Sequence, residues 1–410
     1  MNHYLIIADD FTGANDTGVQ IRRRGIPVRV VFSGRGVTGK ESCVVDTESR
    51  GLSEEEAYRK TASEAGNIPF GDFVQVMKKV DSTLRGNIGA ETRAVADRYN
   101  PELIVFAPAL PDLGRTTVNR IHRLYGTPIT LTEPAGDPKT PVKIDDIRQI
   151  LSHAFPGETA AHIDLEAVRG GRIGLKGGRI FCFDAAANSD LQAIVRAVLA
   201  EGKRVLWVGA AALADSLLEL ERAVPPALAV LASLSSVTRG QALYAEKQGV
   251  SLVKAPLDGI LEKRVNPEET ADRAAGLLKE GKDVVLLASS TYSGEEYRKA
   301  EDSARRSGLS AEAMSAFTQD LMGKLALRLL DGVKISGLFL SGGDTAVGCF
   351  EKAGALGSSI MTEIAAGIPM MRLIGGKHEG LKVATKAGAF GKEDAVFYAL
   401  RKLREADDLC

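Results

Sequence analysis

The chain has 410 residues, of which 44% are hydrophobic and 26% are charged, and its 52 basic residues nearly balance its 53 acidic residues. This composition excludes a disordered chain, and it gives no charge excess of the kind that a nucleic-acid-binding protein carries. The four cysteines are scattered without a C-x-x-C pair, and the N-terminal apolar run is too short for a secretion signal. We therefore expect a cytoplasmic protein with reduced thiols and no membrane segment.

The first half of the chain alternates short apolar runs with amphipathic segments. Ser53 and Glu56 form a capping box at the start of one predicted helix. Near-continuous apolar strands separated by helices predict a largely parallel sheet that is covered on both faces. The predicted strands are residues 5–8, 28–32, 43–46, 73–80 and 102–110, and the predicted helices are residues 14–24, 53–66 and 88–100.

A second series of the same kind follows the proline pair Pro225-Pro226. Because two prolines interrupt both helices and strand ladders, the domain boundary is predicted near residues 222–228. We expect an N-terminal domain of residues 1–224 and a C-terminal domain of residues 225–410. Both are predicted to be α/β domains with largely parallel sheets, facing each other across a cleft. The C-terminal strands are predicted at 227–233, 250–257, 283–290 and 337–343, with helices from about 238, through 274–281 and at 310–331.

Three carboxylates follow the first strand, in the segment ADDFTGAND of residues 8–16. A buried strand needs apolar side chains on its faces, so Asp9 and Asp10 are either solvated loop residues or the first part of a site. Asp16 falls one to two helical turns later and is expected to brace the loop.

A second polar segment, KKVDSTLRGNIGAE of residues 78–91, combines charges with glycines at a strand end. Gly86 and Gly89 allow close approach of the backbone, and the following helix directs its positive N-terminus to the same place. Arginine with helix-end amides suits a planar carboxylate ligand, although a capped helix beside a solvated basic loop fits equally well. The candidate ligand-binding residues of this segment are Lys79, Asp81, Ser82 and Arg85.

A third segment, PALPDLGRTTVNRIH of residues 108–122, is predicted to be an irregular loop that supplies Arg115 as a donor. A lone histidine is more often structural than catalytic, so a structural role is expected for His122 in the same segment. Ligands of parallel α/β sheets bind outside the carboxyl ends of the strands, so the three segments are expected to converge there.

The C-terminal half has comparable loops that are rich in glycine and hydroxyl groups. A glycine turn that exposes amides at a helix N-terminus binds anions as a phosphate loop does. Three such loops in one domain suggest a nucleotide. The candidate residues are Ser233 and Ser235, then Gly342, Gly343, Asp344 and Thr345, and finally Gly388.

ADDFTGAND, KKVDSTLRGNIGAE, PALPDLGRTTVN, SGGDTA and TKAGAFG occur in this order over residues 8–391. In these motifs the chain resembles the four-carbon acid sugar kinases, and the form GANDTGVQ is most similar to the D-threonate kinase branch. The resemblance implies an N-terminal domain that binds a sugar acid and a C-terminal domain that binds ATP. It also implies transfer of phosphate to the terminal hydroxyl, with D-threonate as the expected substrate and D-erythronate or 3-oxo-tetronate as alternatives.

The resemblance assigns roles to the candidate residues. Asp9 or Asp10 would orient or deprotonate the C4 hydroxyl, and Arg85, with Lys79 and Arg115, would hold the substrate carboxylate. Mg²⁺ would accompany ATP, with Asp344 and water as its contacts rather than a dedicated protein metal site. The expected partners are a sugar acid and ATP, without nucleic acid or membrane, and a homo-oligomer is left open.

The sequence departs from the family pattern at three places. The hydroxyl loop, Leu231 to Ser235, lacks the family's usual glycine. Ala389 stands where the family has the second glycine of Ala-Gly-Gly-Phe-Gly, and Asp145-Asp146 stands where it has a Ser-His pair. A nucleotide-dependent oxidoreductase is disfavoured because no G-x-G-x-x-G follows a strand. A non-catalytic sugar-acid sensor remains the alternative from a different class.

Overall fold

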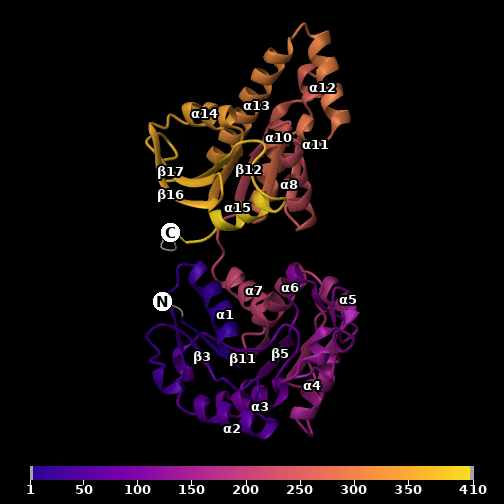
Figure 1. Ribbon diagram of the computed structural model, residues 1–410, viewed down its shortest axis with the longest axis vertical. Coiled ribbons are helices and arrows are strands. Elements are labelled where there is room, and N and C mark those ends of the chain that lie inside the picture. Colours follow the sequence, from indigo (N-terminus) through magenta and orange to yellow (C-terminus); the bar gives the residue numbers. More distant parts are fainter. Residues whose placement is uncertain (1–2, 407–410) are drawn as a thin grey trace. The chain divides into compact units, whose positions relative to one another are not determined.

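The computed structural model describes residues 3–406, apart from the side chain of Asp344. The chain divides into two compact units, with the first ending at Ala223 and the second beginning at Val224. Each unit is built on its own sheet (Figure 1).

The N-terminal unit contains an eight-stranded sheet in the order β2-β3-β1-β4-β11-β5-β10-β9, in which every pairing is parallel. All five residues of β1 are buried, as are those of β3, β5 and β11, which is the pattern of strands covered on both faces. The strands are β1 (Tyr4–Ala8), β2 (Val28–Val31), β3 (Ser42–Asp46), β4 (Gln75–Lys79), β5 (Leu103–Ala107), β9 (Ala160–Ile163), β10 (Ile180–Phe183) and β11 (Val205–Gly209).

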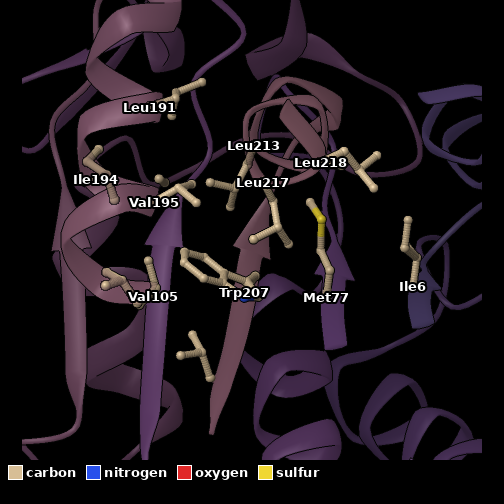
Figure 2. Packing of buried hydrophobic residues seen from close by; sticks show 14 of the residues in the cluster. Ile6, Met77, Val105, Leu191, Ile194, Val195, Trp207, Leu213, Leu217 and Leu218 are labelled. Carbon is tan, nitrogen blue, oxygen red and sulfur yellow. The ribbon is translucent and has the colours of Figure 1, made fainter. Parts of the chain in front are cut away.

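Helices cover both faces of this sheet. One apolar cluster joins the sheet to α1, α5, α6 and α7, and Trp207 of β11 lies within it, near Val105 and Leu217 (Figure 2). A second cluster joins the opposite face to α3 and α4, with α2 packed against α3. The helices are α1 (Phe11–Arg23), α2 (Glu54–Ala65), α3 (Ile88–Tyr99), α4 (Ile147–Ala154), α5 (Leu165–Arg169), α6 (Asn188–Leu199) and α7 (Ala211–Glu221).

Residues 115–128 differ from the expected irregular loop, because they form a small antiparallel sheet. Its strands are β6 (Arg115–Val118), β7 (Ile121–Leu124) and β8 (Thr127–Pro128). The tight turn between β6 and β7 places Asn119 and Arg120 at positive φ, and both backbone N–H groups donate to the buried Asp184 carboxylate. A turn stabilised by a carboxylate so distant in sequence leaves no local Asn-Gly or Asp-Gly signal.

The C-terminal unit contains a seven-stranded sheet in the order β13-β14-β12-β15-β18-β17-β16. Its first five strands are parallel, and β17 and β16 continue the sheet as antiparallel strands. The strands are β12 (Ala227–Leu231), β13 (Ser251–Ala255), β14 (Val284–Ala288), β15 (Gly337–Ser341), β16 (Gly357–Ala365), β17 (Ile368–Ile374) and β18 (Lys382–Lys386).

Helices also cover both faces of the second sheet. Apolar residues of α10, α12, α13 and α14 pack on one face, and those of α8 and α15 pack on the other. The helices are α8 (Ser236–Lys247), α9 (Leu257–Leu261), α10 (Pro267–Lys279), α11 (Ser289–Tyr292), α12 (Gly294–Arg306), α13 (Ala311–Gly332), α14 (Gly343–Lys352) and α15 (Ala395–Leu403). The predicted α/β class with largely parallel sheets is therefore confirmed for both units.

Two further expectations concern membrane segments and the thiols. Among residues 3–406, no helix combines the length and apolar character needed to cross a membrane. Cys43, Cys182 and Cys349 are buried free thiols, and Cys410 lies outside the described residues.

Candidate active site

Charged residues gather at the carboxyl ends of three neighbouring strands of the N-terminal unit. Asp9 and Asp10 directly follow β1, Asp46 ends β3, and Lys79 ends β4. Ala8 is in register with Asp46, and Ile7 is in register with Lys78, so these strand ends lie side by side. Two of the three segments that were expected to converge, residues 8–16 and 78–91, therefore meet at this edge, and the end of β3 joins them.

Arg50, in the loop between β3 and α2, joins the two aspartates. Its Nε donates to Asp9 Oδ2 at 2.7 Å, and its Nη2 donates to Asp9 Oδ1 at 3.2 Å. Nη1 and Nη2 donate to Asp10 Oδ2 and Oδ1 at 2.6 and 2.8 Å. Asp9 is 2% exposed, whereas the Asp10 side chain is 21% exposed and also accepts from the Gly13 backbone N–H as the α1 N-cap. Asp9 is thus buried and holds Arg50 in place, and Asp10 is the aspartate that a ligand can reach.

A buried network fixes the Arg50 loop. The N–H groups of Ser49 and Arg50 donate to the Asp9 carbonyl, and the Ser49 hydroxyl donates to Glu91 at 2.9 Å. Glu91 forms a fully buried ion pair with Lys78 at 2.8 Å. Because burial raises the pKa of the Glu91 carboxyl, the paired ammonium is needed to keep a charge there. The network makes Arg50 a rigid part of the site.

Gly86 must be glycine for the second polar segment to reach this place. Its φ is 90°, and a methyl group there would lie 3.1 Å from Arg50 Cγ and 3.3 Å from Asp9 Oδ2. The glycine therefore lets the loop between β4 and α3 pack directly on the Asp9–Arg50 pair.

Arg85 is already engaged by acidic side chains. Its Nε and Nη2 donate to the two Asp81 oxygens at 2.9 and 3.1 Å, and its Nη1 donates to Asp137 at 3.3 Å. Burial acts to raise the pKa of Asp81, but hydrogen bonds from Arg85 and Thr83 outweigh it and the pKa is lowered. Asp81 is thus an ionised group that orients Arg85 at the edge of the site.

Ser82 and Arg115 both act on His122, Ser82 through a hydrogen bond and Arg115 through its charge. The His122 Nε2 donates to the Ser82 carbonyl at 2.8 Å, and Thr117 bonds its Nδ1 at 2.9 Å. Burial lowers the pKa of His122 to about 4, so it is a neutral structural residue at physiological pH. The Arg115 charge also acts on His122, and Arg115 Nε is buried without a hydrogen-bond partner among the described residues. Arg115 therefore retains donor capacity near the Ser82 turn.

Asp46 is a buried carboxyl that the sequence reading did not select. Its Oδ1 accepts from the Glu48 N–H at 3.0 Å, and its Oδ2 has no hydrogen-bond partner among the described residues. Burial raises the pKa of Asp46 to about 6, and the charges of Glu48 and Asp10 act in the same direction.

We expect Asp46→Asn to stabilise the N-terminal unit at pH 7.5 and to have little effect at pH 4. The folded-state pKa lies above the unfolded value of about 3.9, so wild-type stability falls as the pH rises through this window. The amide removes that cost and can still accept from Glu48. Urea unfolding followed by the single tryptophan, Trp207 in β11, checks this. A stability difference that does not change with pH would contradict it.

In the C-terminal unit, the loops after β12, β15 and β18 converge in the same way. The Thr238 hydroxyl and the Lys386 ammonium both donate to the Gly388 carbonyl at 2.8 Å, and Thr238 lies 3.4 Å from the Ser341 hydroxyl. Ser233 Oγ accepts from the Ser235 N–H at 3.2 Å. The predicted residues Ser233, Ser235 and Gly388 are therefore brought together.

The N-terminus of α14 faces these loops through its cap. Gly342 is the N-cap, with φ of 111°, no side-chain cap, and an N–H that donates to the Lys386 carbonyl at 3.0 Å. Gly343 begins the helix, and Thr345 in its first turn is buried. The Asp344 side chain lies outside the described part of the chain. Uncapped helix-start amides beside glycine and hydroxyl groups make an anion-binding arrangement.

Thr238 and Lys386 belong to the loops that suggested a nucleotide but were not selected as contacts, and Gln241 was missed. Gln241 is buried and its amide nitrogen donates to the carbonyls of Phe390, Gly391 and Lys392, which fixes the loop after β18. Burial lowers the pKa of Lys386 to about 8. Thr238 lies three residues after Ser235 and Lys386 two residues before Gly388, whereas Gln241 lies six residues after Ser235 and had no local signal.

Gly388→Ala should weaken ATP binding. A methyl group at Gly388 would overlap Ser233 Oγ, so the loops after β12 and β18 would separate. We expect the KM for ATP to rise about tenfold or more, with the KM for the sugar acid unchanged. Gly240→Ala in α8 is the matched control, because a methyl group there meets no atom within 4 Å. Equal ATP KM values for the two variants would contradict the assignment.

Asp145 and Asp146, which replace the family's Ser-His pair, have structural partners. Asp145 accepts from the Thr130 hydroxyl, and Asp146 caps α4 by accepting from the N–H groups of Arg148 and Gln149. These contacts give the two aspartates a local structural role.

The described residues contain no group of three or more His, Cys, Asp or Glu side chains that could hold a metal ion.

Two family models match nearly the whole chain. Residues 4–217 match a sugar-binding N-terminal domain, and residues 228–396 match a nucleotide-binding C-terminal domain. The chain is 32% identical to a D-threonate kinase of Salmonella typhimurium, over 98% of each protein. It is 30% identical to a D-threonate kinase of Bordetella bronchiseptica, over 98% of this chain and 97% of that protein. A D-erythronate kinase of Heliobacterium modesticaldum is also 30% identical, over 98% of each.

A solved structure is similar as well. A Bordetella bronchiseptica protein, described as a domain of unknown function and crystallised with citrate as a domain-swapped dimer, is 28% identical to this chain. It aligns over 98% of this chain and 99% of its own, with a TM-score of 0.61. With both domain models matched and relatives aligned end to end, the chain belongs to the four-carbon acid sugar kinase family.

Proposed function

We propose that the protein transfers the γ-phosphate of ATP to the C4 hydroxyl of D-threonate. The observation that carries this proposal is the meeting of Asp10, Arg50, Lys79 and Arg85 at one sheet edge of the sugar-binding unit. Two relatives named D-threonate kinases support D-threonate over the alternatives, which are D-erythronate and 3-oxo-tetronate.

Asp10 is the proposed proton acceptor. The C4 oxygen forms a bond to the γ-phosphorus of ATP while the bond from that phosphorus to the β,γ-bridging oxygen breaks, and ADP leaves. The hydroxyl proton passes to the Asp10 carboxylate and then to solvent. Arg50 holds both aspartates, and Asp10 suits this role because its side chain is 21% exposed whereas Asp9 is 2% exposed. Positioning supplies most of the catalysis in such a transfer.

Arg85 and Arg115 are proposed to bind the substrate carboxylate, with Ser82 beside them. Arg85 is oriented by Asp81 and reaches toward Asp137, and Arg115 has an unused buried donor. A guanidinium binds a carboxylate with charge-assisted and often paired hydrogen bonds.

Arg85→Ala should raise the KM for the sugar acid about 10- to 100-fold, the range expected for loss of a charge-assisted hydrogen bond, with a smaller change in kcat. Arg93→Ala on α3 is the control, since Arg93 is exposed and its contacts, an ion pair to Asp97 at 3.8 Å and the Tyr58 ring at 5.5 Å, lie on the surface. Steady-state kinetics with saturating ATP measures both. An unchanged KM for Arg85→Ala would remove it from the carboxylate site.

ATP is proposed to place its phosphates at Gly342, Gly343 and Thr345 and against the loops of Ser233, Ser235 and Gly388. Mg²⁺ enters the proposal as the partner of the ATP phosphates, because it keeps several waters and needs only one or two carboxylates. Asp344 at the start of α14 is the proposed carboxylate. When bound, the ion neutralises phosphate charge during transfer.

We also propose a homo-oligomer. The Bordetella bronchiseptica relative forms a domain-swapped dimer, and β16 is an edge strand here with mostly exposed residues, including Ile360. Light scattering after size exclusion tests this, and a monomeric mass across concentrations would contradict it.

The test of substrate is ADP release from Mg-ATP with D-threonate, L-threonate, D-erythronate, L-erythronate and 3-oxo-tetronate. We expect the highest kcat/KM for D-threonate. Preference for another acid would change the substrate but keep the kinase. ATP and acid binding by calorimetry without turnover on any acid would favour the sensor instead.

A further inference from the structure

Lys79 is a buried lysine of the N-terminal unit. Its side chain is carried at the end of β4, and the residue is 4% exposed. No hydrogen bond or ion pair connects its ammonium to any described residue. The carboxylates of Asp9, Asp81 and Asp16 act on it electrostatically, and the Arg50 charge opposes them. A buried ammonium without partners is costly, so its retention calls for a ligand.

The ammonium lies at the first turn of α1. A methyl group at Gly13 would lie 2.9 Å from Lys79 Nζ and 2.6 Å from Asp10 Oδ1. The neighbouring strand β11 ends at Gly209, which is in register with Lys79, and α7 starts two residues later. The α7 N-cap is Ala210, which provides no side-chain hydrogen bond. Lys79 is therefore next to the positive starts of two helices that pack against each other.

A lysine ammonium beside two helix N-termini favours an anionic ligand. Because Lys79 and Asp10 both lie next to Gly13, the position of Asp10 indicates which anionic group of the substrate reaches Lys79. A four-carbon sugar acid carries its carboxylate at one end and the C4 oxygen at the other. If Asp10 accepts the C4 proton, the group that arrives on that oxygen is the phosphoryl group. Its oxygens then fall beside Asp10, where Lys79 lies, whereas Arg85 and Arg115 lie at the turn of Ser82.

We infer that the Lys79 ammonium, with the helix starts of α1 and α7, holds the phosphoryl group during transfer and in the 4-phosphate product. This inference rests on the proposed function and changes the expected role of Lys79 from a carboxylate contact to a phosphoryl contact. In the transfer step, Lys79 forms no covalent bond and loses no proton. It stabilises charge on the non-bridging oxygens as phosphorus moves from ADP to the C4 oxygen.

The test compares Lys79→Met with wild type in the full chain. The variant keeps the volume of the side chain and removes its charge. We expect kcat to fall about 10²–10³-fold, as for loss of a positioned transition-state donor. The Kd of the sugar acid should change less than threefold, and the Kd of its 4-phosphate, prepared with the wild-type enzyme, should rise at least tenfold. Lys40→Met, at an exposed lysine of the same unit, is the control and should match wild type.

The outcomes separate the two proposals. A retained Kd for the sugar acid shows that Lys79→Met is folded at the site. If the wild type is active and Lys79→Met keeps its affinity for the 4-phosphate, the Lys79 assignment alone is overturned. The same conclusion follows if Lys79→Met loses affinity for the sugar acid and the 4-phosphate equally. A wild type without kinase activity on any of the five acids overturns the proposed function and this inference together.

Discussion

Asp10→Asn is expected to lower kcat by about 10²–10⁴-fold, the range of a lost general base. Asparagine is a good N-cap and can still accept from Gly13, so α1 should remain intact. The amide cannot take a proton from the C4 hydroxyl. Steady-state kinetics should therefore show a large loss in kcat, with the KM for ATP changed less than twofold because the nucleotide site belongs to the C-terminal unit.

Glu55→Gln on α2 is the matched control for this prediction, because the Glu55 side chain is 80% exposed and the change likewise replaces a carboxylate by its amide, so it should be neutral. Asp9→Asn should also lower activity, through displacement of Arg50. Wild-type kcat in both Asp9→Asn and Asp10→Asn would show that neither aspartate is the base.

Arg50→Met should have the largest effect on stability among the site variants. Asp9 is 2% exposed and depends on Arg50 for its charge-assisted hydrogen bonds. Removing one partner of a buried ion pair leaves an uncompensated charge, which costs about 3–5 kcal/mol. We expect the free energy of unfolding of the N-terminal unit to fall by about this amount, and activity to be lost because Asp10 is no longer held.

Trp207, the only tryptophan, lies in the core of the N-terminal unit and reports its unfolding in urea. Arg59→Met, at an arginine that is 66% exposed on α2, is the control and should stay within about 0.5 kcal/mol of wild type. The double variant Arg50→Met with Asp9→Asn should recover much of the stability and none of the activity. A loss below about 1 kcal/mol for Arg50→Met would contradict the role of Arg50 as the anchor of Asp9.

Strands that are buried on both faces explain why much of the fold was predictable. Apolar runs such as Tyr4–Ala8 and Val205–Gly209 are buried on both faces, and such runs have a direct sequence signature. The hairpin at residues 115–124 had none, because its turn depends on Asp184 far along the chain. The antiparallel pair β16 and β17 is joined by Ala366-Gly367, in which the glycine at positive φ is a usual hairpin residue but the alanine before it is not.

The candidate site was predictable where polar residues lie at the end of a buried strand or within two residues after it, as at Asp9, Asp10, Lys79 and Ser233. Arg50 was missed because it lies four residues beyond the end of β3 and acts through the folded loop rather than through a motif. Asp46 was missed because it is the last residue of the predicted strand 43–46 and belongs to no polar motif. Both lie at the same sheet edge as the predicted aspartates, so the rule that found those aspartates also applies to them.

NMR of the product formed from D-threonate and Mg-ATP by the purified protein shows directly which oxygen receives the phosphoryl group. We expect one new phosphate ester whose phosphorus couples to the two C4 protons, with one ADP released per ester. A phosphate on C2, C3 or the carboxylate would contradict the placement of the C4 hydroxyl at Asp10, and ADP without any ester would contradict transfer to the sugar acid.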